Sequence, residues 1–170
     1  RADRVFLDAG EAQRLGLAAG SYCVIEVEDS GHGIPLEALP HVLPLTEGFV
    51  AVHAGLLPGR PLADQPRRAM VRLRYLDDDG DMLSLEQQER RASPSRFWID
   101  AYDGPVSVAH GHAVLSLTDP VCTQRPHGVE VFSLDTGCVF GGRLTALVLD
   151  DARPGERTFV QVDALRRYAP

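Results

Sequence analysis

The most informative run of this chain is Ser133-Leu134-Asp135-Thr136-Gly137-Cys138-Val139-Phe140-Gly141-Gly142-Arg143-Leu144-Thr145-Ala146-Leu147. Apolar residues precede it at 129–132 and continue past it to 149, and a glycine-rich corner joins the two runs. Its three glycines can adopt a positive φ or let a neighbouring backbone approach closely. The pattern predicts a strand, a tight turn and a second strand, as in a β-hairpin.

Short apolar runs recur along the rest of the chain and predict further strands. A charged stretch at 85–91 predicts a short helix, and the aromatic stretch 97–102 predicts a helix end or turn packed on a sheet. Strands interleaved with short helices indicate a strand-rich α/β fold, with α+β as an open alternative. The other predicted elements are strands at 4–8, 22–28, 48–56, 71–76, 105–112, 129–134 and 158–162, a helix at 11–17, and loops at 58–68 and 121–126.

Length and composition limit the function classes. A chain of 170 residues with 44% hydrophobic residues can bury one ordinary core. Its formal net charge of -7 argues against a general nucleic-acid surface, which needs clustered positive charge. The three cysteines are widely spaced and odd in number, which favours reduced thiols and a cytoplasmic protein. The sequence predicts no membrane span and no signal peptide, and its first residue, Arg1, is consistent with a segment of a longer protein.

Two predicted strands end in histidine beside glycine. The strand 48–56 carries His53, and the strand 105–112 carries His110 and His112. Ligands of open α/β sheets bind at the carboxyl ends of strands, and neutral imidazoles there suit Zn, Mn or Fe. A single histidine at such a place is more often a hydrogen-bonded core residue, so both interpretations stay open.

The four aspartates of the acidic turn 77–81 raise the question of a calcium-binding site. The EF-hand pattern requires Glu at its twelfth position, where this sequence has Gln88, so the turn is predicted to be solvated.

The first resemblance lies in residues 16–42, GLAAGSYCVIEVEDSGHGIPLEALPHV. This run resembles the segment of sensor histidine kinases and related ATPases that ends in the D-x-G-x-G-I nucleotide-binding box. The resemblance implies that Asp29 accepts a hydrogen bond from an adenine amino group, and that Gly31 and Gly33 let the loop pass under the base. The upstream Asn-bearing helix and the glycine-rich lid of that family have no match in the sequence. The alternative is a polar turn after an edge strand.

The second resemblance rests on FVAVHAGL, VAHGHAV, SLDTGCVFGGRLTALVLD and VQVDALRRY, in this order. These stretches are similar to the carboxyl-terminal half of calcineurin-type metallophosphoesterases, in the branch of bacterial symmetrical diadenosine tetraphosphatases and of the phosphatase module of polynucleotide kinase-phosphatases. The likeness begins near residue 39. We therefore divide the chain into an uncertain strand–helix–strand segment, 1–38, and a metallophosphoesterase carboxyl-terminal half, 39–170.

The resemblance implies half of a two-sheet α/β sandwich with a divalent-metal centre of Mn, Fe or Zn at its strand ends. His53 and His112 match the metal-ligand histidines of the family, and His110 is a neighbour. Arg72 or Arg74 is a candidate for holding a substrate phosphate. The implied partner is a phosphorylated small molecule or a dinucleoside polyphosphate.

One departure from the family pattern limits this prediction. The family draws most metal ligands from the amino-terminal motifs D-x-H, G-D-x-x-D-R and G-N-H-E, and none occurs here. Two histidines cannot organise two divalent ions without those carboxylates. We expect the chain alone to be poorly active or inactive, unless a missing amino-terminal half or a partner chain completes it, and no catalytic side chain is assigned. The alternatives are a non-catalytic binding or scaffold domain and an adenine-nucleotide-binding fragment.

Overall fold

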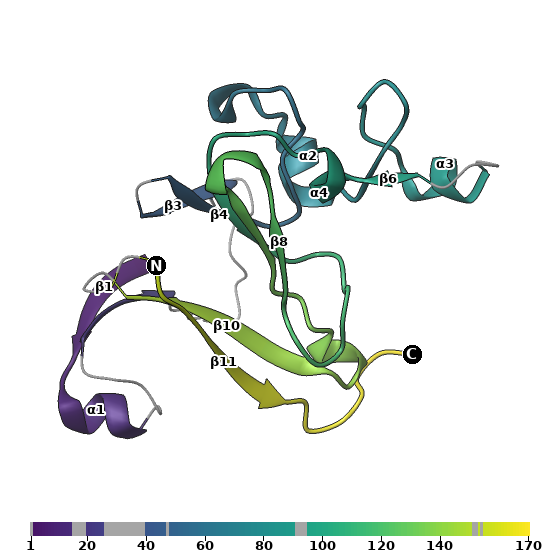
Figure 1. Cartoon of the computed structure of the whole chain (residues 1–170). Helices are drawn as coiled ribbons and strands as arrows, with labels where there is room; N and C mark the ends of the chain where they lie inside the picture. Colours follow the sequence, from purple (N-terminus) through teal and green to yellow (C-terminus); the bar gives the residue numbers. More distant parts are fainter. Residues whose placement is uncertain are drawn as a thin grey trace. The chain divides into compact units, whose positions relative to one another are not determined.

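The computed structural model of the chain describes residues 2–14, 20–25, 40–46, 48–90, 95–150, 153 and 155–170. The chain divides into two compact units (Figure 1). The first comprises Arg1–Leu39 with Ala146–Gln161, and the second comprises Pro40–Thr145 with Val162–Pro170. Within the described residues, no helix has the length and apolar character needed to cross a membrane.

The first unit contains a small antiparallel strand pair. Strand β1 (Ala2–Leu7) pairs with β2 (Gly20–Ile25), and the helix α1 (Ala9–Arg14) lies between them in the chain. The Asp8 carboxylate accepts a hydrogen bond of 2.8 Å from the Gly10 N–H, which orders the first turn of α1. The predicted strand–helix–strand order is confirmed. The residues proposed to bind adenine, Asp29, Gly31 and Gly33, lie outside the described residues, so that role stays a prediction.

The second unit is built on a five-stranded mixed sheet of order β3-β4-β7-β9-β8. Its three central strands run parallel, and the two edge strands are antiparallel to their neighbours. Successive residues of the central strands are buried, so both faces of these strands are covered, which explains their apolar runs. The predicted α/β class is confirmed. The strands are β3 (Val42–Thr46), β4 (Phe49–Val52), β7 (Ser107–His110), β8 (Val121–Gln124) and β9 (Glu130–Ser133).

The loop predicted at 121–126 was wrong. Residues Val121–Gln124 form β8, which pairs with β9 from Val121 opposite Ser133 to Gln124 opposite Glu130. An edge strand keeps one face in solvent, so its polar residues resemble those of a loop. The short 3-10 helix η3 (Pro126–Gly128) then leads into β9.

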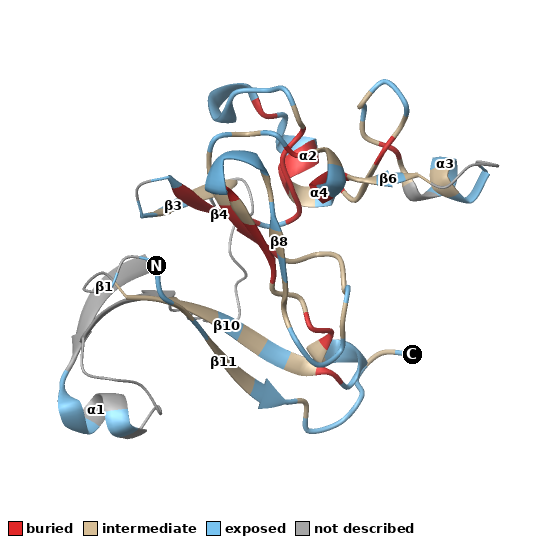
Figure 2. Cartoon of the chain, in the orientation of Figure 1, coloured by how far each residue is buried: buried red, intermediate tan, exposed pale blue. Residues whose placement is uncertain are grey.

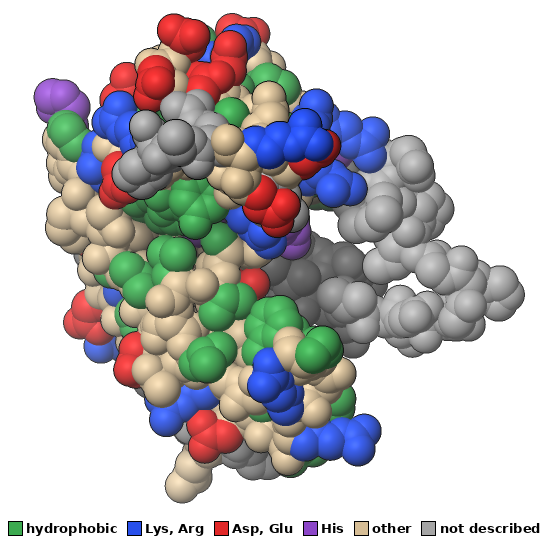
Figure 3. All heavy atoms as spheres, turned by 90° about the vertical axis from the view of Figure 1, so that its right-hand side faces the viewer, with side chains coloured by type: hydrophobic (Ala, Val, Ile, Leu, Met, Phe, Trp, Pro, Cys, Tyr) green, Lys and Arg blue, Asp and Glu red, His purple; other side chains and the backbone are tan. Residues whose placement is uncertain are grey.

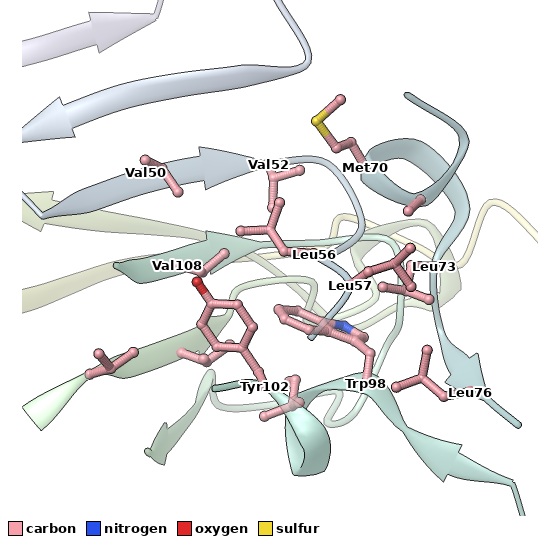
Figure 4. Packing of buried hydrophobic residues seen from close by; sticks show 14 residues of the cluster. Val50, Val52, Leu56, Leu57, Met70, Leu73, Leu76, Trp98, Tyr102 and Val108 are labelled. Carbon is pink, nitrogen blue, oxygen red and sulfur yellow. The ribbon is translucent and has the colours of Figure 1, made fainter. Parts of the chain in front are cut away.

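The hydrophobic core packs against one face of this sheet (Figure 4). Two short helices contribute to it, α2 (Arg67–Arg72) with Ala69 and Met70, and α4 (Trp98–Ala101) with Trp98. Figure 2 shows the buried residues gathering on β4 and around these helices. The Trp98 side chain is completely buried, and its ring lies 5.5 Å from that of Tyr102.

The prediction of a strand at 71–76 was wrong over most of its length. The chain is helical up to Arg72, and within this range only β5 (Tyr75–Leu76) forms a strand, paired with β6 (Arg96–Phe97). Ala69, Met70 and Leu73 are buried and lie on one side of the helical turn. A search for alternating apolar and polar residues that begins at residue 71 does not reveal this spacing.

Between β5 and β6 the chain makes an acidic turn and a short helix. The Asp77 carboxylate accepts hydrogen bonds from the N–H groups of Asp79 and Asp81, as in an Asx turn. The predicted helix at 85–91 is confirmed as α3 (Leu85–Arg90). A further 3-10 helix, η2 (Leu62–Asp64), lies in the loop before α2.

The hairpin predicted around the glycine-rich corner was wrong. Strand β9 pairs with β7 and β8, whereas β10 (Arg143–Leu149) pairs with β11 (Arg157–Asp163), so the corner carries the chain from one sheet to another. Gly137 and Gly141 flank the 3-10 helix η4 (Cys138–Phe140) with φ of 63° and 89°, which glycine adopts without strain. The Thr136 hydroxyl donates to the Arg143 carbonyl at 2.6 Å and closes the corner.

Candidate functional site

Three parallel strands, β4, β7 and β9, end side by side, and each is followed by a candidate site residue. His53 follows β4, His112 follows β7 by two residues, and Asp135 follows β9 by two residues. The Gly111 N–H donates to the His53 carbonyl at 3.0 Å, and the Leu134 N–H donates to the His110 carbonyl at 2.8 Å. These backbone bonds hold the segments after the strands at one edge of the sheet, where α/β proteins bind ligands.

The imidazoles of His53 and His112 face each other across this edge. Their ring centroids lie 5.0 Å apart with the ring planes tilted by 57°. His53 is exposed and His112 is half-buried. The φ of His112 is 67°, a left-handed conformation that is uncommon for a residue with a side chain and is often found at functional sites.

Arginines lie next to this histidine pair. Arg74 donates from Nη2 to the His112 carbonyl at 3.1 Å. Arg72 and Arg74 line a cleft of about 370 Å³ together with His112 and Arg68. Figure 3 shows arginine side chains gathered beside a histidine on the face that it draws. The remaining lining residues are Met82, Leu83, Ser84, Glu86 and Gln88.

Sequence reasoning missed Arg68. A correctly placed helix at Arg67–Arg72 would have revealed it, because residues four apart share a helix face.

The surroundings of His112 favour the neutral form of its imidazole. Burial lowers its pKa most, and the nearby Arg74 guanidinium lowers it further, while the Asp135 carboxylate acts in the opposite direction. A neutral imidazole offers a lone pair, which is the form that binds metals.

His110 lies beneath the site and is almost completely buried. Its Nδ1 lies 2.9 Å from the Gly111 carbonyl and its Nε2 lies 2.7 Å from the Ser133 hydroxyl. Because a carbonyl can only accept, Nδ1 carries the proton and Nε2 accepts from Ser133. The ring also meets Trp98 edge-on at 5.1 Å. His110 therefore ties the ends of β7 and β9 together and does not face the cleft.

We predict that His110 makes the second unit less stable in acid. Burial lowers its pKa from 6.5 to about 4, so between these values the unfolded chain binds a proton that the folded chain does not. Stability is therefore full above pH 6.5 and falls as the pH drops towards 4, by about 3 kcal/mol from this group. Urea unfolding at pH 7.0, 5.5 and 4.5, followed by Trp98 fluorescence, measures the loss.

The control is His110→Phe, which removes the titrating ring. This variant is expected to be less stable at pH 7, because the Ser133 hydroxyl loses its partner, but to lose much less stability between pH 7.0 and 4.5. An equal pH dependence in both proteins would contradict the assignment.

The donor set fits only part of a metal centre. Among the residues that the structure describes, no group of three or more His, Cys, Asp or Glu side chains could hold a metal ion. His53 and His112 can supply two nitrogen ligands, and a two-metal site would need carboxylates in addition.

Comparisons with known proteins bear on the family resemblance. No family model matches the chain. The symmetrical bis(5'-nucleosyl)-tetraphosphatase of Citrobacter koseri is 37% identical over 87 residues, which cover 50% of this chain and 30% of that protein. The protein of the same name from Edwardsiella ictaluri is 39% identical over 90 residues, which cover 49% of this chain and 30% of its own length. The chain thus spans about a third of the length of the curated relatives it matches.

A solved crystal structure is also similar. It is that of a protein provisionally assigned as a diadenosine tetraphosphatase, with a TM-score of 0.55 and 27% identity, covering 76% of this chain and 53% of that one. These likenesses agree with the phosphoesterase resemblance and with the α/β fold. They give no support to the kinase-like resemblance of residues 16–42.

Proposed function

We propose that this chain contributes to a metal-dependent phosphoesterase site for dinucleoside polyphosphates or related phosphate esters. One observation carries the proposal: His53 and His112 face each other at neighbouring parallel strand ends, with rings 5.0 Å apart and an arginine-lined cleft beside them. The names of the similar proteins, symmetrical tetraphosphatases, support the substrate class.

In this proposal His53 and His112 are ligands of a divalent metal, Mn, Fe or Zn. Such an ion, when bound, polarises a phosphoryl oxygen and activates water. Arg72 and Arg74 hold the substrate's phosphate oxygens. Arg74 is positioned by its bond to the His112 carbonyl, which places one guanidinium beside the metal ligands. Guanidinium groups suit this role because their donors match phosphate geometry in pairs.

In this proposal the described residues supply two of the ligands that a two-metal centre needs, His53 and His112. The remaining carboxylates would come from polypeptide outside these residues or from a partner chain, so we expect weak hydrolysis by the chain alone. A non-catalytic binding domain that retains the sheet is the second candidate. It is favoured because the described residues contain no group of three or more His, Cys, Asp or Glu side chains that could hold a metal ion.

Metal binding tests the proposal. Titration of the purified chain with Mn²⁺, followed by the EPR signal of the free ion, is expected to show about one bound ion. Replacing both histidines, His53→Ala with His112→Ala, should abolish this binding and any hydrolysis of bis(p-nitrophenyl) phosphate, because the two proposed nitrogen ligands are then gone. Each single replacement should weaken binding by roughly tenfold or more.

His127→Asn is a matched control. His127 is exposed and shares a positive φ with His112, and Asn tolerates that conformation. It should bind Mn²⁺ as the unchanged chain does. A chain that takes up no Mn²⁺ at millimolar concentration would overturn the phosphoesterase proposal in favour of a non-catalytic domain.

A further inference from the structure

Three guanidinium groups line the cleft beside His112. Arg68 and Arg72 are four residues apart on α2, so their side chains leave the same side of the helix. Arg74 follows two residues later, and its Nη2 bond to the His112 carbonyl fixes its position. All three line the same cleft of about 370 Å³.

The positive charges of these arginines are not neutralised by described carboxylates. Among the described residues, no carboxylate forms an ion pair with Arg68, Arg72 or Arg74, and the one acidic residue in the cleft lining, Glu86, pairs with Arg90. The Nε of Arg74 is buried and has no hydrogen-bond partner in the part of the chain that the structure describes. Like charges four apart on a helix repel each other, and a buried donor without a partner is costly.

An arginine on an exposed helix is ordinarily just solvated, and Arg67 of the same helix is of that kind. Arg68 and Arg72 are exposed as well, but they differ from Arg67 because they line the same cleft as the half-buried Arg74. An anion in that hollow would offset the repulsion and give each guanidinium a paired acceptor.

The cleft also suits an elongated anion better than a compact one. Its volume lies in the range of small-molecule sites, which is larger than a single phosphate requires. Ser84 and Gln88 add neutral polar groups to the lining, and these can donate hydrogen bonds to phosphate oxygens. His112 belongs to the same lining, so an anion in the cleft lies next to the histidine pair.

We propose that this cleft is a subsite for a chain of two or more linked phosphates, read by Arg68, Arg72 and Arg74, and that it binds them without a metal ion. The inference deepens the proposed function, because the subsite would hold the non-reacting phosphates of a substrate whose reacting phosphate lies at His53 and His112. Arg68 is the residue that distinguishes a linked from a single phosphate.

Calorimetric titration of the full chain with inorganic tripolyphosphate in EDTA tests this directly. We expect saturable binding, and binding of orthophosphate weaker by roughly tenfold or more. Arg68→Gln and Arg72→Gln should each weaken tripolyphosphate binding by roughly tenfold to a hundredfold, since each removes a charge-assisted contact. Circular dichroism spectra establish that the variants are folded.

Arg67→Gln is the matched control, because Arg67 lies on the same helix, is exposed and does not line the cleft. It should bind tripolyphosphate nearly as the unchanged chain does. An equal loss in Arg67→Gln would mean that only diffuse positive charge attracts the anion, and would overturn the subsite. So would the absence of binding, or equal affinity for tripolyphosphate, orthophosphate and citrate.

The tripolyphosphate titration and the Mn²⁺ titration test different proposals, and either can fail without the other. Binding of tripolyphosphate in EDTA by a chain that takes up no Mn²⁺ would support the subsite and overturn the phosphoesterase proposal. The opposite outcome is metal-dependent hydrolysis by the chain, together with tripolyphosphate binding that is unchanged in Arg68→Gln and Arg72→Gln. That outcome would support the phosphoesterase proposal and overturn the subsite.

Discussion

Trp98→Ala is expected to destabilise the second unit by about 3 to 5 kcal/mol, the usual cost of emptying a large buried site. The Trp98 side chain is completely buried and packs edge-on against the rings of Tyr102 and His110. Gly55 lies so close that a Cβ there would come within 2.6 Å of the indole, so the backbone is shaped around this ring. Urea unfolding followed by far-UV circular dichroism measures the loss, since the substitution removes the single tryptophan.

Trp98→Phe separates packing from the polar atom of the indole. The Trp98 Nε1 is buried with no hydrogen-bond partner among the described residues, so phenylalanine removes an unsatisfied donor while filling much of the volume. We expect it to cost less than half as much as alanine. Equal costs for the two substitutions, or a cost below about 1 kcal/mol for alanine, would contradict the packing argument.

Gly142→Ala is the second substitution with a large expected effect, about 3 kcal/mol or more. A Cβ at this position would lie 2.1 Å from the Thr136 carbonyl oxygen and 2.7 Å from that of Leu117. Both atoms belong to the backbone and cannot move away as a flexible side chain can. The corner would have to open, which weakens the bonds from the Gly142 N–H to Gly137 and from the Arg143 N–H to Thr136. Unfolding followed by Trp98 fluorescence reports on the second unit.

Gly111→Ala provides the comparison for this prediction. A Cβ at Gly111 would meet no atom closer than 3.8 Å, and its φ is not in the left-handed range. We expect a change of less than about 1 kcal/mol. If Gly111→Ala and Gly142→Ala destabilised the chain equally, the close backbone approach at Gly142 would not explain the loss.

The apolar runs predicted the central strands because those strands are buried on both faces. They could not predict strand partners, since pairing depends on contacts distant in sequence. The runs before and after the corner therefore suggested a hairpin, whereas β9 and β10 belong to different sheets. Edge strand β8 was not predicted, because a half-exposed strand is as polar as many loops.

The candidate site was predictable in part. His53 and His112 come together because two parallel neighbouring strands end at the same side of the sheet. The apolar runs predicted both strands and placed a histidine at the end of each. The arginine cleft was not predictable as a whole, because Val71-Arg72-Leu73-Arg74 alternates like a strand. Its actual conformation depends on the burial of Ala69 and Met70 against the core, which the local pattern does not contain.

The glycine-rich corner also depends on a segment that lies well beyond it in the sequence. The Ala164 N–H donates to the Gly142 carbonyl, and the N–H groups of Tyr168 and Ala169 donate to the Val139 carbonyl. These carbonyls of the corner have their backbone donors only while residues 164–169 are folded against it, so we expect the corner and this segment to become ordered together.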